Sequence, residues 1–192
     1  MFRLFVAIDL PADVKARLLP LCGGLPGARW VDGGQLHLTL RFIGEVDGGV
    51  RREIEGALAE VQAASFTLAL QGVGHFPPRG QPRVVWVGVE KSSPLNHLHG
   101  RVETALAVAG VERDGRKFSP HITLARLTAT PATRVGRYLE EFGLFRTEPF
   151  PVDEFTLYSS TLTRHGAVHT LEAAYPLGVK NTGGDESRPY RH

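Results

Sequence analysis

The sequence predicts an α+β fold in which helices cover one face of antiparallel sheets. Two observations support this class. Segments that alternate apolar and polar residues, as half-buried strands do, recur along the chain, and segments of helical composition separate them. The chain has 192 residues, of which 42% are hydrophobic and 22% charged. These values are typical of a soluble globular protein with a core of ordinary size.

The expected elements follow one another from the first residue. Pro11 suits the first turn of a helix, since a helix N-terminus leaves that backbone donor unpaired anyway. Asp47-Gly48-Gly49 ends one strand, and the proline-rich residues 75–82 read as a loop. We expect strands at 1–9, 28–32, 37–46, 66–73, 83–89, 121–127, 152–160 and 167–177, and helices at 11–22, 50–64, 93–109 and 131–142.

Charge and cysteine content narrow the function classes. The net charge of +2 excludes a surface that attracts all polyanions, so any affinity for nucleic acid must come from local groups of Arg and Lys. The single cysteine, Cys22, excludes an internal disulfide and a zinc site with several cysteines. Residues 1–11 are too short to span a membrane and lack a signal-peptide cleavage pattern. We therefore expect a cytoplasmic monomer that does not bind membranes.

One short pattern occurs twice, as His37-Leu38-Thr39-Leu40 and as His121-Ile122-Thr123-Leu124. Alternation along a strand puts the histidine and threonine of each copy on one face and its apolar residues on the other. Two such pairs facing each other would place two imidazoles and two hydroxyls around one small anion.

This constellation suits acid–base chemistry on a phosphodiester. A histidine has an ordinary pKa of ~6.5, so one neutral and one protonated imidazole can divide the proton transfers between them. Threonine hydroxyls can donate to phosphate oxygens whose charge grows in the transition state. The chemistry needs no cofactor or metal, and the sequence has no carboxylate cluster that would indicate one.

The repeated motif, with FRLFVAIDLP, RFIGEV, PRVVWVGV, SPHITLARL and FTLYSSTL, resembles the LigT-like two-histidine (2H) phosphoesterases, and more narrowly the RNA 2′,3′-cyclic phosphodiesterases. The resemblance implies a bilobal fold of two pseudo-symmetric antiparallel sheets, with outer helices, a central groove and one motif per lobe. It assigns this domain to residues 1–178 and leaves 179–192 as a polar tail.

The same resemblance implies the reaction and the roles. The enzyme opens a 2′,3′-cyclic phosphate at an RNA 3′ end and leaves a 2′-phosphomonoester. His37 is then the general acid that protonates O3′, and His121 is the general base that activates water. Thr39 and Thr123 hold the phosphate. Some relatives also run the reverse reaction and join RNA ends through a 2′,5′ linkage.

Four further residues are candidates for substrate binding. Arg126 suits the phosphate and Phe42 a base, although strict alternation puts both opposite the histidines unless the strands bulge. Arg41 shares the His37 face by alternation and is a candidate phosphate contact, while Tyr158 suits base stacking. His165 and His169 flank a turn without an acidic partner nearby, so we expect no metal site there.

Other functions remain open at this stage. The site also suits a phosphodiesterase for small cyclic nucleotides or for 2′,5′-oligoadenylate. A non-catalytic RNA-binding module with the same fold is a different class, and the presence of both histidines and both threonines argues against it. A metal-dependent hydrolase is disfavoured because the sequence offers no ligand set.

Overall fold

The computed structural model describes residues 1–164 and 166–178. Within them the chain forms the elements β1 (Phe2–Asp9), α1 (Ala12–Leu18), β2 (Ala28–Trp30), β3 (His37–Val46), α2 (Gly48–Ala59), β4 (Phe66–Leu68), β5 (Leu70–Phe76), β6 (Val84–Val89), α3 (Ser93–Val108), β7 (His121–Leu127), α4 (Ala132–Phe142), β8 (Phe150–Val152), β9 (Glu154–Thr163) and β10 (Gly166–Pro176). Two short 3-10 helices, η1 (Leu19–Leu21) and η2 (Gly33–Gln35), complete the described part.

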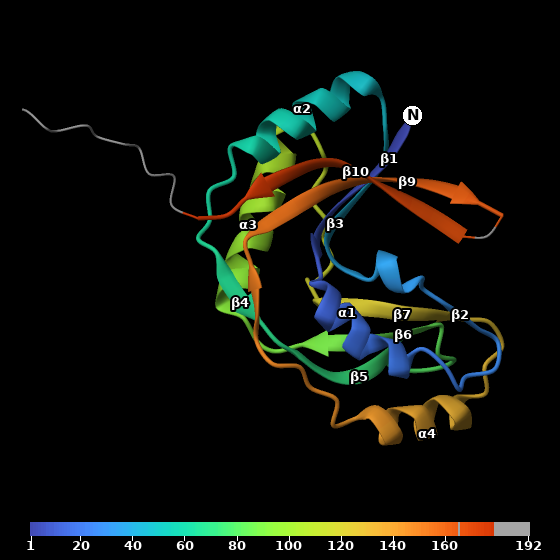
Figure 1. The fold of residues 1–192 in the computed structure, drawn as a ribbon. Coiled ribbons are helices and arrows are strands. Elements are labelled where there is room, and N and C mark those ends of the chain that lie inside the picture. Colours follow the sequence, from blue (N-terminus) through green and yellow to red (C-terminus); the bar gives the residue numbers. More distant parts are fainter. Residues whose placement is uncertain (165, 179–192) are drawn as a thin grey trace, which may run out of the picture.

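The predicted α+β class is confirmed. The large antiparallel sheet has the order β10-β9-β1-β3-β7-β6-β5, with β2 added beside β7, and β4 pairs with β8 in a separate ribbon. One residue pair, Leu38 opposite Ile122, joins β3 to β7. We call β10-β9-β1-β3 the first half and β7-β6-β5 with β2 the second half (Figure 1).

The predicted strand over 66–73 corresponds to two observed strands. The segment 66–73 is divided at Ala69, because β4 pairs with β8 whereas β5 pairs with β6. Pairing with β6 also extends β5 to Phe76, into the predicted loop. The division into one bilobal domain over 1–178 and a tail over 179–192 stays a prediction, and the tail lies outside the described residues.

Helices cover both halves on the side away from the motif histidines. α2 and α3 pack against each other and against strands of the first half, and α4 packs on β5 of the second half (Figure 1). The Tyr138 hydroxyl of α4 donates to the Leu21 carbonyl at 2.7 Å, which ties α4 to the segment after α1. No helix in the described ranges has the length and apolar content needed to cross a membrane.

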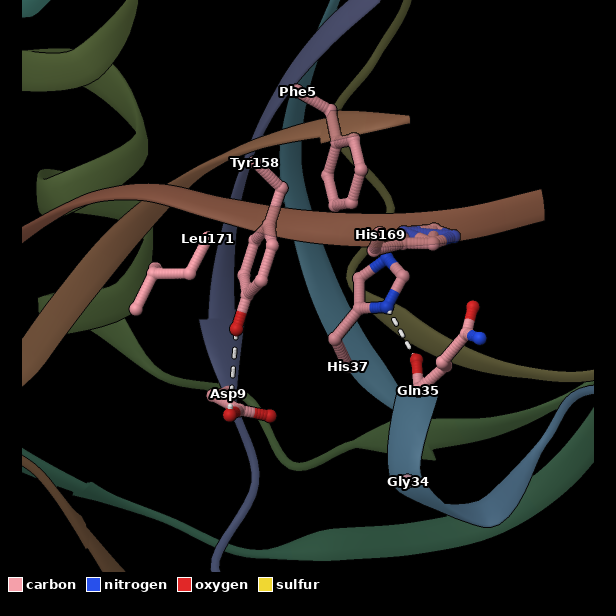
Figure 2. Close-up of a pocket in the computed structure, with 8 residues that line it drawn as sticks. All are labelled: Phe5, Asp9, Gly34, Gln35, His37, Tyr158, His169 and Leu171. Atoms are coloured by element: carbon pink, nitrogen blue, oxygen red, sulfur yellow. Dashed lines mark hydrogen bonds between the residues drawn. The ribbon is translucent and has the colours of Figure 1, made fainter. Parts of the chain in front are cut away.

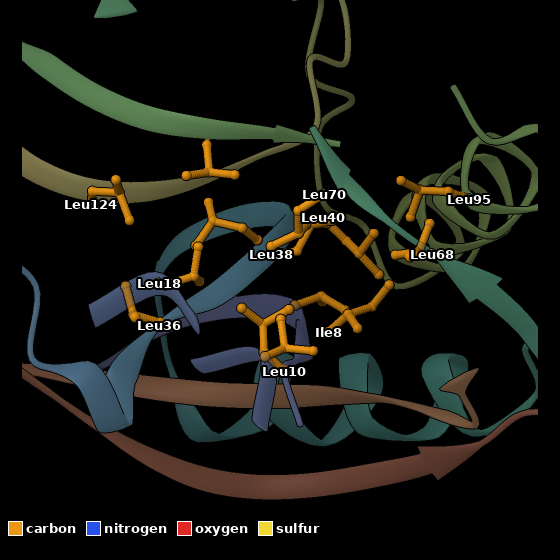
Figure 3. Close-up of a cluster of buried hydrophobic side chains, with 14 of the residues drawn as sticks. Ile8, Leu10, Leu18, Leu36, Leu38, Leu40, Leu68, Leu70, Leu95 and Leu124 are labelled. Atoms are coloured by element: carbon orange, nitrogen blue, oxygen red, sulfur yellow. The ribbon is translucent and has the colours of Figure 1, made fainter. Parts of the chain in front are cut away.

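The apolar residues of both motifs lie in the core between the sheet and the helices (Figure 3). Leu38, Ile122 and Leu124 are fully buried, and Leu40 is 3% exposed. Burying each such side chain contributes about 1.5–3 kcal/mol, so the core holds both motif strands in a fixed orientation. The polar residues between them must then point to the opposite face of the sheet.

Candidate active site

The first motif strand bulges just after Thr39. Ala7 of β1 pairs with Thr39, and the residue before it, Val6, pairs with Arg41. Leu40 therefore has no partner on β1. A bulge of this kind inserts one residue and reverses the alternation beyond it. Arg41 therefore lies on the core face with Val6.

The second motif strand bulges at the equivalent residue. Trp86 of β6 pairs with Thr123 and Val85 pairs with Ala125, which leaves Leu124 without a β6 partner. The reversal puts Arg126 on the face of Thr123, where Arg126 is exposed. The same reversal on β3 puts Phe42 beside Phe5, at 5.6 Å between ring centroids, with 45% of Phe42 exposed. The bulges thus bring Phe42 and Arg126 to the histidine face.

The two motifs meet where the halves join. In the antiparallel register set by Leu38 and Ile122, each motif histidine lies opposite the threonine of the other strand. Four half-buried polar side chains therefore surround one point on the sheet face: His37, Thr39, His121 and Thr123.

Both histidines are held by the same hydrogen bond. His37 Nδ1 lies 2.7 Å from the Gln35 carbonyl oxygen, and His121 Nδ1 lies 2.7 Å from the Ser119 carbonyl oxygen. A carbonyl oxygen only accepts, so each Nδ1 carries the proton and donates it. Each Nε2 is then the atom that can take up or release a proton toward the centre of the site.

The His37 ring lies in a pocket of about 250 Å³ (Figure 2). It stacks on Phe5 at 5.0 Å between centroids, and its Nε2 lies 3.0 Å from the Thr39 hydroxyl oxygen. Burial lowers the pKa of His37, and the Gln35 carbonyl acts in the opposite direction. Among the charged neighbours, His169 lowers the pKa, the Asp9 carboxylate raises it and Lys15 lowers it.

The His121 ring lies against aromatic side chains of the second half. It meets Phe76 edge-on at 4.9 Å and Trp86 at 6.2 Å between centroids. The Trp86 indole covers Gly74, where a Cβ atom would lie 2.3 Å from the ring, so this arrangement requires glycine. Burial lowers the pKa of His121, opposed by the bond to the Ser119 carbonyl.

Comparison with known proteins now identifies the family. The model of the 2′-5′ RNA ligase superfamily matches residues 5–164. The chain belongs to this superfamily. The predicted resemblance to LigT-like two-histidine phosphoesterases is confirmed, because apo LigT of E. coli superposes with a TM-score of 0.76 at 29% identity, over 93% of this chain and 98% of that one.

Relatives within the superfamily carry a consistent name. An RNA 2′,3′-cyclic phosphodiesterase of Archaeoglobus fulgidus is 35% identical over 174 residues, which cover 87% of this chain and 96% of the relative. One of Thermotoga maritima is 35% identical over 175 residues, or 88% of this chain and 92% of the relative. LigT complexed with 3′-AMP superposes with a TM-score of 0.75 at 29% identity, covering 92% of this chain and 98% of LigT.

The prediction that Arg41 lies on the His37 face and contacts phosphate is wrong. Because of the bulge at Leu40, its side chain lies on the core face, 9% exposed, and its Nε donates to Glu103 of α3 at 2.5 Å. Its two other nitrogens donate to the carbonyls of Phe42 and Glu112. Arg41 therefore links β3 to α3 and to the segment that precedes His121, and its guanidinium is not available to a phosphate.

Tyr158 lies beside His37, and its role in base stacking stays a prediction. It lines the His37 pocket and stacks on Phe5 at 5.4 Å, and its hydroxyl lies 3.5 Å from Asp9 Oδ2. Burial raises the pKa of Tyr158, and the charge of Asp9 raises it further. The phenol therefore stays protonated and able to donate at neutral pH.

The structure adds three residues that the sequence interpretation did not assign to the site. Asp9 pairs with His37 in the β1–β3 register, and its place at the end of the first strand was the available signal. Arg29 of β2 lies opposite Arg126, so it shares the exposed face of that arginine. His169 of β10 lines the His37 pocket. In the described ranges, no group of three or more His, Cys, Asp or Glu residues is placed to hold a metal ion.

Proposed function

We propose that this protein opens 2′,3′-cyclic phosphates at RNA 3′ ends by two-histidine acid–base catalysis and leaves a 2′-phosphomonoester. The observation that carries this proposal is the crossed arrangement of two His-Thr pairs around Leu38 and Ile122, with both Nε2 atoms free of the backbone. The curated relatives that are named for this activity support the proposal. The reverse reaction, which forms a 2′,5′ linkage, would use the same groups.

In the proposed reaction, His121 Nε2 takes a proton from water, and the resulting oxygen attacks phosphorus. The P–O3′ bond breaks as His37 Nε2 gives its proton to O3′. This division of roles rests on the resemblance to the LigT-like family. The two surroundings do differ, since His169 and Lys15 lower the pKa of His37 and Asp9 raises it, whereas no charged group acts on His121. Each proton transfer of this kind contributes about 10²–10⁴-fold to the rate.

Three further side chains would bind the phosphate as charge develops on it. The hydroxyls of Thr39 and Thr123 would donate to its non-bridging oxygens. Arg126 is exposed on the same face and its guanidinium can pair with two phosphate oxygens at once. Side chains alone thus provide every proton and countercharge, so we propose that the reaction needs no metal or cofactor.

Aromatic side chains would bind the terminal nucleoside on the His37 side. Phe42 is 45% exposed beside Phe5, and Tyr158 lines the adjacent pocket. Stacking of a base on such rings is worth about 1–3 kcal/mol and tolerates any base. Small cyclic nucleotides would occupy the same place. Activity on RNA and activity on small cyclic nucleotides are therefore distinguished by comparing substrates of different chain length. The monomeric state and cytoplasmic location stay predictions.

The test is turnover of a short RNA that ends in a 2′,3′-cyclic phosphate, with excess EDTA present. We expect complete conversion to the 2′-phosphate by the wild type, identified by phosphorus NMR, and a rate lower by about 10²-fold or more in the variant His37→Ala/His121→Ala. The matched control is His97→Ala, an exposed histidine on α3. A 3′-phosphate product, a requirement for metal, or turnover by the double variant at the wild-type rate would contradict the proposal.

A further inference from the structure

A third histidine lies beside the proposed acid. His169 of β10 pairs with Ser160 of β9, and both strands belong to the first half. Its ring centroid is 5.3 Å from that of His37 and 4.8 Å from that of Phe5, which it meets edge-on. Figure 2 shows the His169 and His37 rings next to each other in the pocket that both residues line.

The His169 ring is partly buried, but it has no hydrogen bond to any of the described residues. Its Nδ1 is buried and has no hydrogen-bond partner among the described residues. A buried polar nitrogen without a partner is costly, and such atoms in native proteins call for an explanation. Because Nδ1 is enclosed, a ligand in the pocket that both histidines line would contact the ring through Nε2.

The neighbouring ionisable groups do not form an ion pair with His169. Asp9 lies 2.8 Å from the Lys15 ammonium and also accepts from Tyr158, and none of these groups shifts the His169 pKa. Burial alone lowers that pKa, so the ring is neutral in the free protein at neutral pH. The nearest ionisable ring, His37, is itself a cation when it acts as the acid. An anion in the pocket is therefore the ligand that suits both imidazoles.

We propose that His169 is a third substrate-binding imidazole, which hydrogen-bonds a phosphate oxygen of the terminal nucleotide next to His37. This inference rests on the proposed function. Its position supports it, because the ribose whose O3′ receives the His37 proton must lie in the same pocket. Two phosphates of RNA have this chemistry near that ribose: the reacting phosphate, and the 5′ phosphate that joins the ribose to the preceding nucleotide.

Two variants separate ligand binding from packing. His169→Phe keeps a ring against Phe5 but has no hydrogen-bonding atom, whereas His169→Gln keeps a neutral donor and loses the ring. The control is His97→Gln on the exposed face of α3. At pH 6 we expect His169→Phe to raise KM by about tenfold or more with a smaller change in kcat, and His169→Gln to raise KM less. Normal KM in His169→Phe with a defect confined to His169→Gln would overturn the proposal, since packing alone would explain it.

Two substrates identify which phosphate is bound. Cytidine 2′,3′-cyclic phosphate has only the reacting phosphate, whereas the dinucleotide ApC ending in a 2′,3′-cyclic phosphate also has the joining one. A KM defect with both substrates indicates the reacting phosphate, and a defect with the dinucleotide alone indicates the joining phosphate. Either result supports the proposal, and equal KM values for wild type and His169→Phe on both substrates would overturn it.

Calorimetric titration with cytidine 2′-monophosphate keeps this test separate from the proposed function. We expect the wild type to bind this nucleotide more tightly at pH 6 than at pH 8, by a larger factor than His169→Phe does, because a protonated imidazole binds a phosphate dianion better than a neutral one. This measurement needs no turnover. If the wild type fails to hydrolyse either substrate, the proposed function fails while the binding comparison still decides the role of His169. An unchanged ratio between the two pH values in His169→Phe would count against the inference.

Discussion

The two halves of the molecule hold their histidines in the same way but surround them differently. Each motif strand bulges at the leucine that ends its motif, Leu40 or Leu124, and each histidine donates through Nδ1 to the carbonyl two residues before it. Around His37 lie ionisable groups from β1, β9 and β10, whereas around His121 lie Phe76 and Trp86.

This comparison separates two requirements of the site. Both histidines share the bond from Nδ1 to a backbone carbonyl, as the proposed mechanism requires if both Nε2 atoms are to face one phosphate. In the proposed mechanism an acid and a base need opposite starting states, which unequal surroundings can provide. Burial lowers the pKa of both histidines. Charged neighbours act on His37 alone, where His169 and Lys15 lower the pKa and Asp9 raises it. The pseudo-symmetry is therefore one of geometry and not of electrostatics.

Removal of either motif histidine has the largest expected effect. His37→Ala and His121→Ala should each lower kcat by about 10²–10⁴-fold, since each removes one proton transfer. The kcat of the double variant should be only slightly lower than that of the less active single variant, because the two groups act in one step. Full additivity of the two losses in logarithmic units would contradict a concerted role.

Breaking the buried ion pair should cost stability and not chemistry. Arg41→Met removes the arginine partner of the Glu103 carboxylate, itself 8% exposed, and leaves it with His99 Nε2 at 3.9 Å. We expect a loss of about 3–5 kcal/mol in the free energy of unfolding, measured with urea. Arg116→Gln breaks an exposed ion pair with Asp114 and is the control that should leave the urea midpoint unchanged. An unaltered midpoint in Arg41→Met would contradict the assigned role of this residue.

The threonines should differ between the halves. Thr39→Val and Thr123→Val should each lower kcat by about 10- to 100-fold through loss of a donor to the phosphate. Only the Thr39 hydroxyl lies within hydrogen-bond distance of a motif histidine, at 3.0 Å from His37 Nε2. We therefore expect Thr39→Val alone to move the pH dependence of kcat/KM as well. Equal shifts in both variants would remove this distinction between the halves.

The smallest expected effect is on stability at mildly acidic pH. Burial lowers the pKa of His37, His121 and His169 in the folded state. Because the unfolded chain, with a pKa of ~6.5, then binds more protons, this stabilisation is complete above pH ~6.5 and is lost as pH falls toward the folded values. Calorimetry should show a lower Tm at pH 5.5 than at pH 7.5, with a smaller difference in His169→Gln. A Tm that rises on acidification would show the opposite sign.

The sequence was sufficient for the parts that depend on local pattern. Alternation correctly placed His37, Thr39 and their equivalents on one face, because no irregularity precedes them in their strands. It failed for Arg41, since a bulge is a property of the pairing between two strands and Leu40 carries no local signal of it. Glu103, which holds Arg41, is 62 residues away in the chain.

His169 illustrates a second limit of sequence. Its position beside His37 depends on three successive pairings, of β10 with β9, β9 with β1 and β1 with β3. Each pairing is set by long-range packing, so no spacing in the sequence relates residue 169 to residue 37. Tyr158 was easier to identify because an aromatic residue on a strand suits stacking wherever the strand lies.

The most direct test of unequal roles in an otherwise symmetric site is the pH dependence of residual activity in the two single alanine variants. Wild-type kcat/KM should be bell-shaped, with His121 titrating on the acidic side and His37 on the basic side. We predict that His37→Ala loses the fall at high pH and that His121→Ala loses the fall at low pH. Loss of the opposite limb in each variant would contradict the assignment of His37 as acid and His121 as base.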